Sequence, residues 1–188
     1  MSTDVDTRPR RRHLWIAAAL AGTLVAVLVT QRITGVGGSD AGDLRTQIAA
    51  RMVTVLESTP AEQHGGHGAH AAGYGTATTV CAVRIFGFEP ADAGSLDRVD
   101  VVYGHHLCGI AEGRRHWDGA VKLVGPVVMR LSTDPPTIQV AEATQTATFR
   151  ERVLELIPAR YQAEAFEESL DVSAMTELRR RYDDAAGF

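Results

Sequence analysis

Apolar residues run without a charge from Leu14 to Thr30 (LWIAAALAGTLVAVLVT). As an α-helix this run would span about 25 Å, close to the thickness of a membrane's hydrocarbon core. Four arginines precede the run and one follows it, so the positive-inside rule places the N-terminus in the cytoplasm. We therefore expect a cytoplasmic basic tail over 1–13, a transmembrane helix over 14–30, a tether over 31–38 and an extracytoplasmic domain over 39–188.

A cleaved signal peptide is the alternative explanation of this apolar run. Signal peptides have a shorter apolar region, followed promptly by a cleavage site between small residues. Here the run is followed by Gln31 and Arg32, and the nearest small-residue motif is Val36-Gly37-Gly38. The sequence therefore favours an uncleaved, single-pass signal anchor, with the membrane as a partner through residues 14–30.

The pattern after the tether changes from helical to strand-like and back to helical. Apolar residues recur at helical spacing from Leu44 to Leu56, which predicts a helix over 40–58 with Ser39 as its N-cap and Pro60 beyond its end. Segments dense in β-branched residues then predict strands over 76–88, 98–111, 120–132 and 137–142. Helical spacing returns over 149–157, 159–169 and 173–184.

This order of elements predicts an α+β domain with an antiparallel four-stranded sheet and helices packed on one face of it. Cystatin-like and NTF2-like folds are analogies of element order only. In the third strand, the pair Gly125-Pro126 should either bend the strand or place it at an edge of the sheet.

Charge is distributed unevenly along the chain. From Ile33 onward the sequence has 14 basic and 21 acidic residues, a net charge of −7. An acidic domain is poorly suited to bind phosphate backbones, so we expect no nucleic-acid partner. Arginine greatly outnumbers lysine and asparagine is absent, a composition typical of a GC-rich bacterial genome.

The two cysteines, Cys81 and Cys108, both fall in the predicted first hairpin. If they face one another, the connecting turn centres on Gly94-Ser95, where turn-forming residues are found. Directly opposed residues of a non-hydrogen-bonded antiparallel pair lie within disulfide range. An oxidising exterior allows such a bond to persist, so we predict a structural disulfide.

Three histidines lie close together in a Gly- and Ala-rich loop over 60–75. His64, His67 and His70 could bind Zn²⁺, Cu²⁺ or Ni²⁺, since neutral imidazole suits all three ions. Ordering a glycine-rich loop costs about 1–2 kcal/mol per residue, which favours a solvated, mobile loop instead. His105 and His106 are adjacent on a strand and point to opposite faces, so at most one of them could add a ligand.

Trp117 lies in a predicted turn beside Arg114 and Arg115. If exposed, this group could anchor a protein interface. Alternatively, the indole folds back and covers the end of the sheet. Motifs of serine hydrolases, phosphate-binding loops and zinc proteases are absent from the sequence, so we propose no catalytic residue.

Three stretches of the domain, VVYGHHLCGIAEG, GPVVMRLSTDPPTIQVAEA and FRERVLELIP, carry a loose family resemblance. They resemble the membrane-anchored extracytoplasmic domains of uncharacterised actinobacterial proteins. The residues that match are Tyr103, Cys108, Pro126, Arg130, Leu131, Ile157 and Pro158. Such domains have no established activity, so the resemblance implies a location and a fold but no function.

These observations lead us to expect a membrane-anchored, non-enzymatic domain of the cell envelope that engages a protein or cell-wall partner. Two alternatives stay open: an extracytoplasmic transition-metal-binding protein that uses the histidine loop, and an enzyme without a recognisable motif. The sequence does not determine the oligomeric state.

Overall fold

The computed structural model describes residues 36–64, 77–167 and 170–188. The chain divides into two compact units, 1–42 and 43–188, and the features below belong to the second, apart from the start of α2 at residues 36–42. The expected transmembrane segment, 14–30, lies outside the described residues. Among the helices that are described, none combines the length and the apolar character that crossing a membrane requires.

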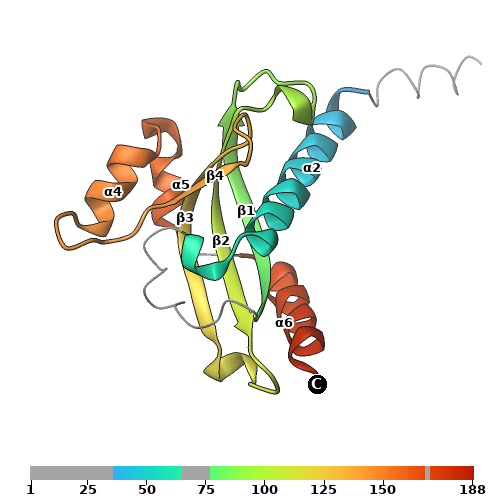
Figure 1. Ribbon diagram of the computed structural model, residues 1–188. Helices are drawn as coiled ribbons and strands as arrows, with labels where there is room; N and C mark the ends of the chain where they lie inside the picture. Colours follow the sequence, from blue (N-terminus) through green and yellow to red (C-terminus); the bar gives the residue numbers. More distant parts are fainter. Residues whose placement is uncertain (1–35, 65–76, 168–169) are drawn as a thin grey trace, which may run out of the picture. The chain divides into compact units, whose positions relative to one another are not determined.

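The second unit is an α+β domain built on an antiparallel sheet with the strand order β1-β2-β3-β4 (Figure 1). This confirms the predicted fold class and the predicted four-stranded sheet. The described elements are α2 (Val36–Ser58), η1 (Ala61–Gln63), β1 (Thr78–Glu89), η3 (Leu96–Arg98), β2 (Val101–Ala111), η4 (Trp117–Gly119), β3 (Val121–Arg130), β4 (Thr137–Val140), α4 (Phe149–Leu156), η5 (Ala159–Tyr161), α5 (Gln162–Phe166) and α6 (Val172–Ala186).

Several predicted boundaries differ from those of the structure, and two of the differences have local reasons. Helix α2 already begins at Val36, so Ser39 lies inside the helix and not at its N-cap. Strand β2 begins at Val101, three residues later than predicted, because Leu96–Arg98 forms a 3₁₀ turn between the strands. The other end of α2 is as predicted, since the helix stops at Ser58, before Pro60.

The predicted disulfide and the register that it implies are both present. Cys81 faces Cys108 across β1 and β2, and a disulfide joins them with a Cα–Cα distance of 4.0 Å. Both cysteines are fully buried, which suits a structural bond. The predicted pairing holds as far as Ile85, after which a bulge at Phe86 shifts the register by one residue.

Helices cover both faces of the sheet, so the prediction that they pack on one face was wrong. Strand β2 shows the reason, because ten of its eleven residues are buried. On one face its side chains Val102, Cys108 and Ile110 pack against α2. The side chains on its other face, such as Val101, Tyr103 and Ala111, pack against the C-terminal helices. A nearly continuous apolar strand is typical of a sheet covered on both sides.

The C-terminal helices share the second face between them. Helix α6 packs along β1 and β2 (Figure 1), where Leu178 and Tyr182 join a cluster with Val80 and Ala111. Helices α4 and α5 pack on the same face, at the ends of the strands that lie away from α6. Their separate cluster contains Phe86, Tyr103, Val128, Val153, Ile157 and Ala165.

Pro126 lies where β3 changes from an edge strand to an interior one. Strand β4 pairs only with Val127–Arg130, so the earlier part of β3 forms an edge of the sheet. The carbonyl of Pro126 accepts a hydrogen bond from the Ala141 amide, 2.8 Å long. Gly125 has a φ of 154°, which favours glycine. The expectation that this pair marks an edge is confirmed.

At the other edge of the sheet, two side chains bind the outward-facing backbone of β1. The Glu57 carboxylate accepts a hydrogen bond from the Cys81 amide at 2.8 Å, and the Arg181 guanidinium donates to the Cys81 carbonyl at 3.0 Å. Glu57 and Arg181 also form an ion pair at 2.6 Å. This edge clamp, Glu57 with Arg181, links α2 on one face to α6 on the other and blocks further strand pairing at Cys81.

We expect Glu57→Ala to lower the free energy of unfolding by about 1–3 kcal/mol, because it leaves the Cys81 amide and the Arg181 guanidinium without their acceptor. Urea unfolding followed by circular dichroism measures the change. The matched control is Glu177→Ala, which removes an ion pair with Arg180 in which both side chains are more than half exposed. That change should cost at most about 1 kcal/mol. Equal losses for the two variants would contradict the clamp.

Candidate functional site

Of the three histidines of the predicted metal site, the structure describes only His64. Its side chain is fully buried, and its Nε2 lies 3.0 Å from the Thr59 carbonyl oxygen. His67 and His70 lie outside the described residues. Within the described part of the chain, no group of three or more His, Cys, Asp or Glu residues is placed to hold a metal ion. A metal site on this loop therefore stays a prediction.

His105 and His106 do not converge, as their positions on one strand predict. His106 is fully buried, and its Nδ1 lies 2.9 Å from the Gly125 carbonyl oxygen. His105 belongs to the opposite face, where its ring stands edge-on to Phe86 with the ring centres 6.0 Å apart. It also lies opposite Arg84, the partner that the predicted register assigned to it.

Trp117 folds back over the sheet, the second of the two alternatives derived from the sequence. Only 7% of it is exposed, and its ring stands edge-on to Tyr182 with the ring centres 5.2 Å apart. Gly109 makes this approach possible, because a Cβ there would lie 2.7 Å from the indole. Trp117 is therefore part of the core and not an exposed interface anchor.

Arg114 and Arg115 are exposed beside Trp117, and local contacts hold both of them. The guanidinium of Arg115 pairs with Glu112 at 2.9 Å, and that of Arg114 lies 5.8 Å from the centre of the Phe188 ring. The Arg115 carbonyl accepts a hydrogen bond from the Tyr182 hydroxyl at 2.9 Å. Burial of that hydroxyl raises the pKa of Tyr182. These contacts give the two arginines a role in fixing the turn to α6.

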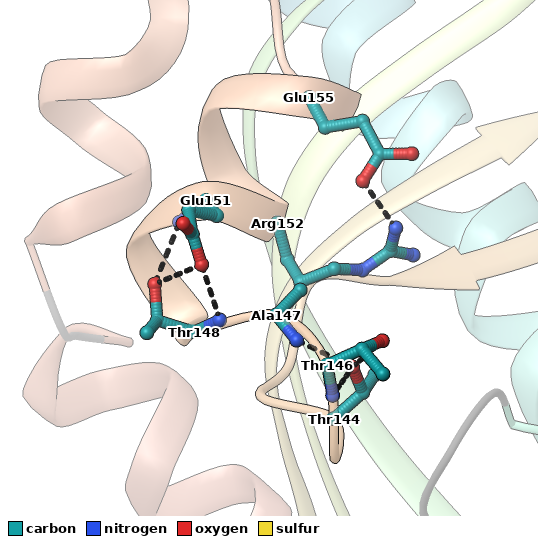
Figure 2. Close-up of polar contacts among 7 residues, drawn as sticks. All are labelled: Thr144, Thr146, Ala147, Thr148, Glu151, Arg152 and Glu155. Carbon is teal, nitrogen blue, oxygen red and sulfur yellow. Dashed lines mark hydrogen bonds and ion pairs between the residues drawn. The ribbon is translucent and has the colours of Figure 1, made fainter.

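A different group of exposed side chains lies on α4 and α5. Helix α4 begins with a capping box, shown in Figure 2. The Thr148 hydroxyl accepts a hydrogen bond from the Glu151 amide at 3.2 Å, and the Glu151 carboxylate accepts one from the Thr148 amide at 2.7 Å. The bond from the Thr148 amide is the main reason that the pKa of Glu151 is lowered. The box fixes the first turn of α4, which carries Phe149 and Arg150.

The segment before the box is held by its own hydrogen bonds. The Thr144 hydroxyl accepts from the amides of Thr146 and Ala147, at 3.3 and 3.0 Å (Figure 2). The Thr144 amide in turn donates to the Ala147 carbonyl at 2.8 Å. The chain therefore enters α4 along a defined path, and the position of Phe149 is determined by backbone hydrogen bonds.

Three large apolar side chains around this helix start are exposed. Phe149 is 39% exposed, Leu154 45% and Phe166 38%. Phe149 and Phe166 meet edge to face with their ring centres 5.9 Å apart. Leu154 is four residues after Arg150 and therefore shares its side of the helix. We call Phe149, Arg150, Leu154 and Phe166 the α4–α5 surface.

Arg150 supplies the one charge of the α4–α5 surface. Its guanidinium lies 5.5 Å from the centre of the Phe166 ring. The structure, in the residues it describes, gives Arg150 no acidic partner, whereas its neighbour Arg152 pairs with Glu155 at 2.5 Å (Figure 2). An arginine held over an aromatic ring with its donors open to solvent can bind a carboxylate in two-pronged geometry. Chemically, this surface is suited to recognition.

Comparisons of the chain with protein-family models, with curated proteins and with solved structures find no match. The function is therefore inferred from the surfaces of the domain itself.

In the predicted helix over 149–157, Phe149, Val153, Leu154 and Ile157 mark the helical spacing. In the structure Val153 and Ile157 are buried, and Phe149 and Leu154 are exposed. With Leu156, five of the nine residues 149–157 are apolar, and Leu154 falls outside the stripe that the other four form at helical spacing. This number of apolar residues was the signal in the sequence that some of them would be exposed. Only the packing of α4 shows which side chains remain exposed to solvent.

We expect Thr148→Ala to destabilise the domain by about 1 kcal/mol at neutral pH, because it removes the N-cap of α4. A lowered carboxyl pKa contributes stability above the ordinary pKa of glutamate and loses it as the pH falls through the lowered value. Thr148→Ala keeps the backbone amide but removes the bond from the Thr148 hydroxyl to the Glu151 carboxylate, 2.9 Å long, which also lowers this pKa. The difference between wild type and Thr148→Ala should therefore shrink in acid by the share that this hydroxyl contributes, and urea unfolding at neutral and acidic pH measures it. A difference that is constant with pH would contradict a contribution of the hydroxyl to the pKa of Glu151, and Thr176→Ala, within α6, is the control.

Proposed function

We infer that this chain is a membrane-anchored domain of the cell envelope that binds a partner protein through the α4–α5 surface, without catalysing a reaction. The observation that carries the proposal is the exposure of Phe149, Leu154 and Phe166 around an arginine that has no acidic partner among the described residues. Aromatic and arginine side chains gathered in one place are typical of the residues that contribute most to protein–protein binding.

The chemistry of the α4–α5 surface limits the kind of partner. Its apolar part would be covered by aliphatic or aromatic side chains of the partner. Arg150 lies among these apolar groups, so its guanidinium would be buried when the partner binds. A carboxylate of the partner should then lie close to it, because a buried guanidinium without an acidic partner is costly in free energy. The partner that fits is a protein segment with an acidic residue next to apolar side chains.

The anchored, extracytoplasmic location is supported by two features. The apolar run over 14–30 and its preceding arginines favour an anchor with the domain outside the cytoplasm. The disulfide between Cys81 and Cys108 suits an oxidising compartment. Membrane anchoring would also confine the domain to two dimensions, which raises its effective concentration toward other membrane proteins.

Site-directed photo-cross-linking in cells that naturally contain the chain tests the partner. With the cross-linker at Leu154, we expect one discrete adduct with another protein, because Leu154 would be covered by the partner. Phe166→Ser and Arg150→Gln should each reduce this adduct about tenfold or more, the loss expected for a dominant contact residue. The cross-linker at Thr176, exposed on α6, should give no such adduct.

Two results would overturn this proposal. An adduct that forms equally well in the Phe166→Ser and Arg150→Gln variants would not come from the α4–α5 surface. An adduct with twice the mass of the chain would show self-association, and the surface would then be an interface between copies.

Reporter fusions to the C-terminus test the location. A fusion to alkaline phosphatase, which requires disulfide formation, should be active, and a fusion to green fluorescent protein should be dark after export in unfolded form. Deleting residues 14–30 should reverse both results. An inactive phosphatase together with a bright fluorescent fusion of the intact chain would place the domain in the cytoplasm.

A further inference from the structure

A surface hollow lies between α2, the connection from β1 to β2, and the end of β3. Its volume is about 510 Å³, within the range of small-ligand sites. Gln47 and Arg51 line it from α2, one helical turn apart. The other two segments line it with Ser95, Leu96, Asp97, Val99, Asp100, Leu131 and Ser132. None of these residues belongs to the α4–α5 surface.

Backbone hydrogen bonds join two of the three walls of the hollow. The Asp100 carbonyl accepts from the Leu131 amide at 2.8 Å, which ties the β1–β2 connection to the end of β3. Within that connection, the Val99 amide donates to the Leu96 carbonyl at 3.1 Å. Main-chain bonds therefore fix these two walls relative to each other, and α2 supplies the third wall with Gln47 and Arg51.

The walls carry opposite charges that do not neutralise one another. The Arg51 guanidinium and the Asp100 carboxylate have neither a hydrogen bond nor an ion pair in the part of the chain that the structure describes. Asp97 is held by Ser95, and that hydrogen bond lowers the pKa of Asp97 and keeps it charged. The hollow therefore presents one cation from α2 and two anions from the β1–β2 connection.

Apolar groups complete the lining. Leu96, Val99 and Leu131 contribute side chains to the hollow, and Val99 is buried in the core behind it. Among the residues that the structure describes, no aromatic side chain lines it, so these residues offer no flat apolar platform on which a sugar ring would stack. A single inorganic ion would be opposed by the wall of the other sign. The lining matches a small molecule that has a carboxylate, an ammonium group and an apolar side chain.

We propose that this hollow binds a zwitterionic amino acid or dipeptide, with Arg51 on the carboxylate and Asp100 and Asp97 on the ammonium group. Arg51 can bind the carboxylate through two parallel N–H···O bonds. The apolar side chain of the ligand would lie against Leu96 and Leu131. This site is independent of the α4–α5 surface and of the partner protein inferred above.

Nuclear magnetic resonance titration of the full chain in detergent, with alanyl-alanine as the probe, tests the site. We expect saturable shifts of the backbone amide signals of Arg51 and of residues 95–100. The C-terminal amide of the dipeptide lacks the carboxylate, and its N-acetyl derivative lacks the ammonium group. Each should bind at least about tenfold more weakly than alanyl-alanine, as expected for the loss of a charged hydrogen-bonded contact.

Variants then assign each wall to one end of the ligand. Arg51→Gln should weaken alanyl-alanine about tenfold and leave the C-terminal amide unaffected, since the contact it removes is already lost there. Asp100→Asn should likewise weaken the binding of alanyl-alanine about tenfold and leave the binding of the N-acetyl derivative unaffected. The controls are Arg130→Gln and Asp118→Asn, exposed charges outside the hollow, which should change nothing.

The proposal is overturned if alanyl-alanine causes no saturable shift at these amides. It is also overturned if both derivatives bind as well as the parent dipeptide, because charge recognition would then be absent. A loss that is the same for the wall variants and for the controls would mean that net charge alone governs binding, and would equally exclude the site. None of these results depends on the cross-linking at the α4–α5 surface.

Discussion

The pairing of Cys81 with Cys108 determines which side chains of the central hairpin face α2 and which face the C-terminal helices. Side chains alternate along a strand, so a slip of one residue would exchange the two faces of β2. Here both faces are apolar and both are covered, and hydrophobicity alone would discriminate weakly between the two registers. The disulfide removes that ambiguity, and the positions of His105, His106 and Trp117 follow from it.

The edge clamp adds a second constraint at the same residue. Glu57 comes from α2 and Arg181 from α6, on opposite faces of the sheet, and both bind the backbone of Cys81. The strand that carries the disulfide is therefore also the point at which the two helical layers are joined. With these layers fixed, α4 and α5 cover the remaining part of the second face, and the side chains that they cannot bury form the α4–α5 surface.

The two candidate binding regions differ in how the fold produces them. The α4–α5 surface results from an excess of apolar residues on a short helix whose start is fixed by Thr148 and Glu151. The hollow beside Arg51 lies between α2 and two segments that are joined to each other by main-chain hydrogen bonds. The first is suited to a large apolar partner with a carboxylate, and the second to a small charged molecule.

Local patterns in the sequence determined much of this protein: the four strands, the Cys81–Cys108 pairing, the end of α2 before Pro60 and the edge at Pro126. Each depends on near neighbours in the chain or on one hairpin. Only the tertiary structure decided that Trp117 is buried, that Phe149 and Leu154 are exposed, that Glu57 meets Arg181, and that Arg51 lies in one hollow with Asp100. These are contacts between segments far apart in sequence, and the spacing of residues along the chain carries no information about which distant surfaces will pack together.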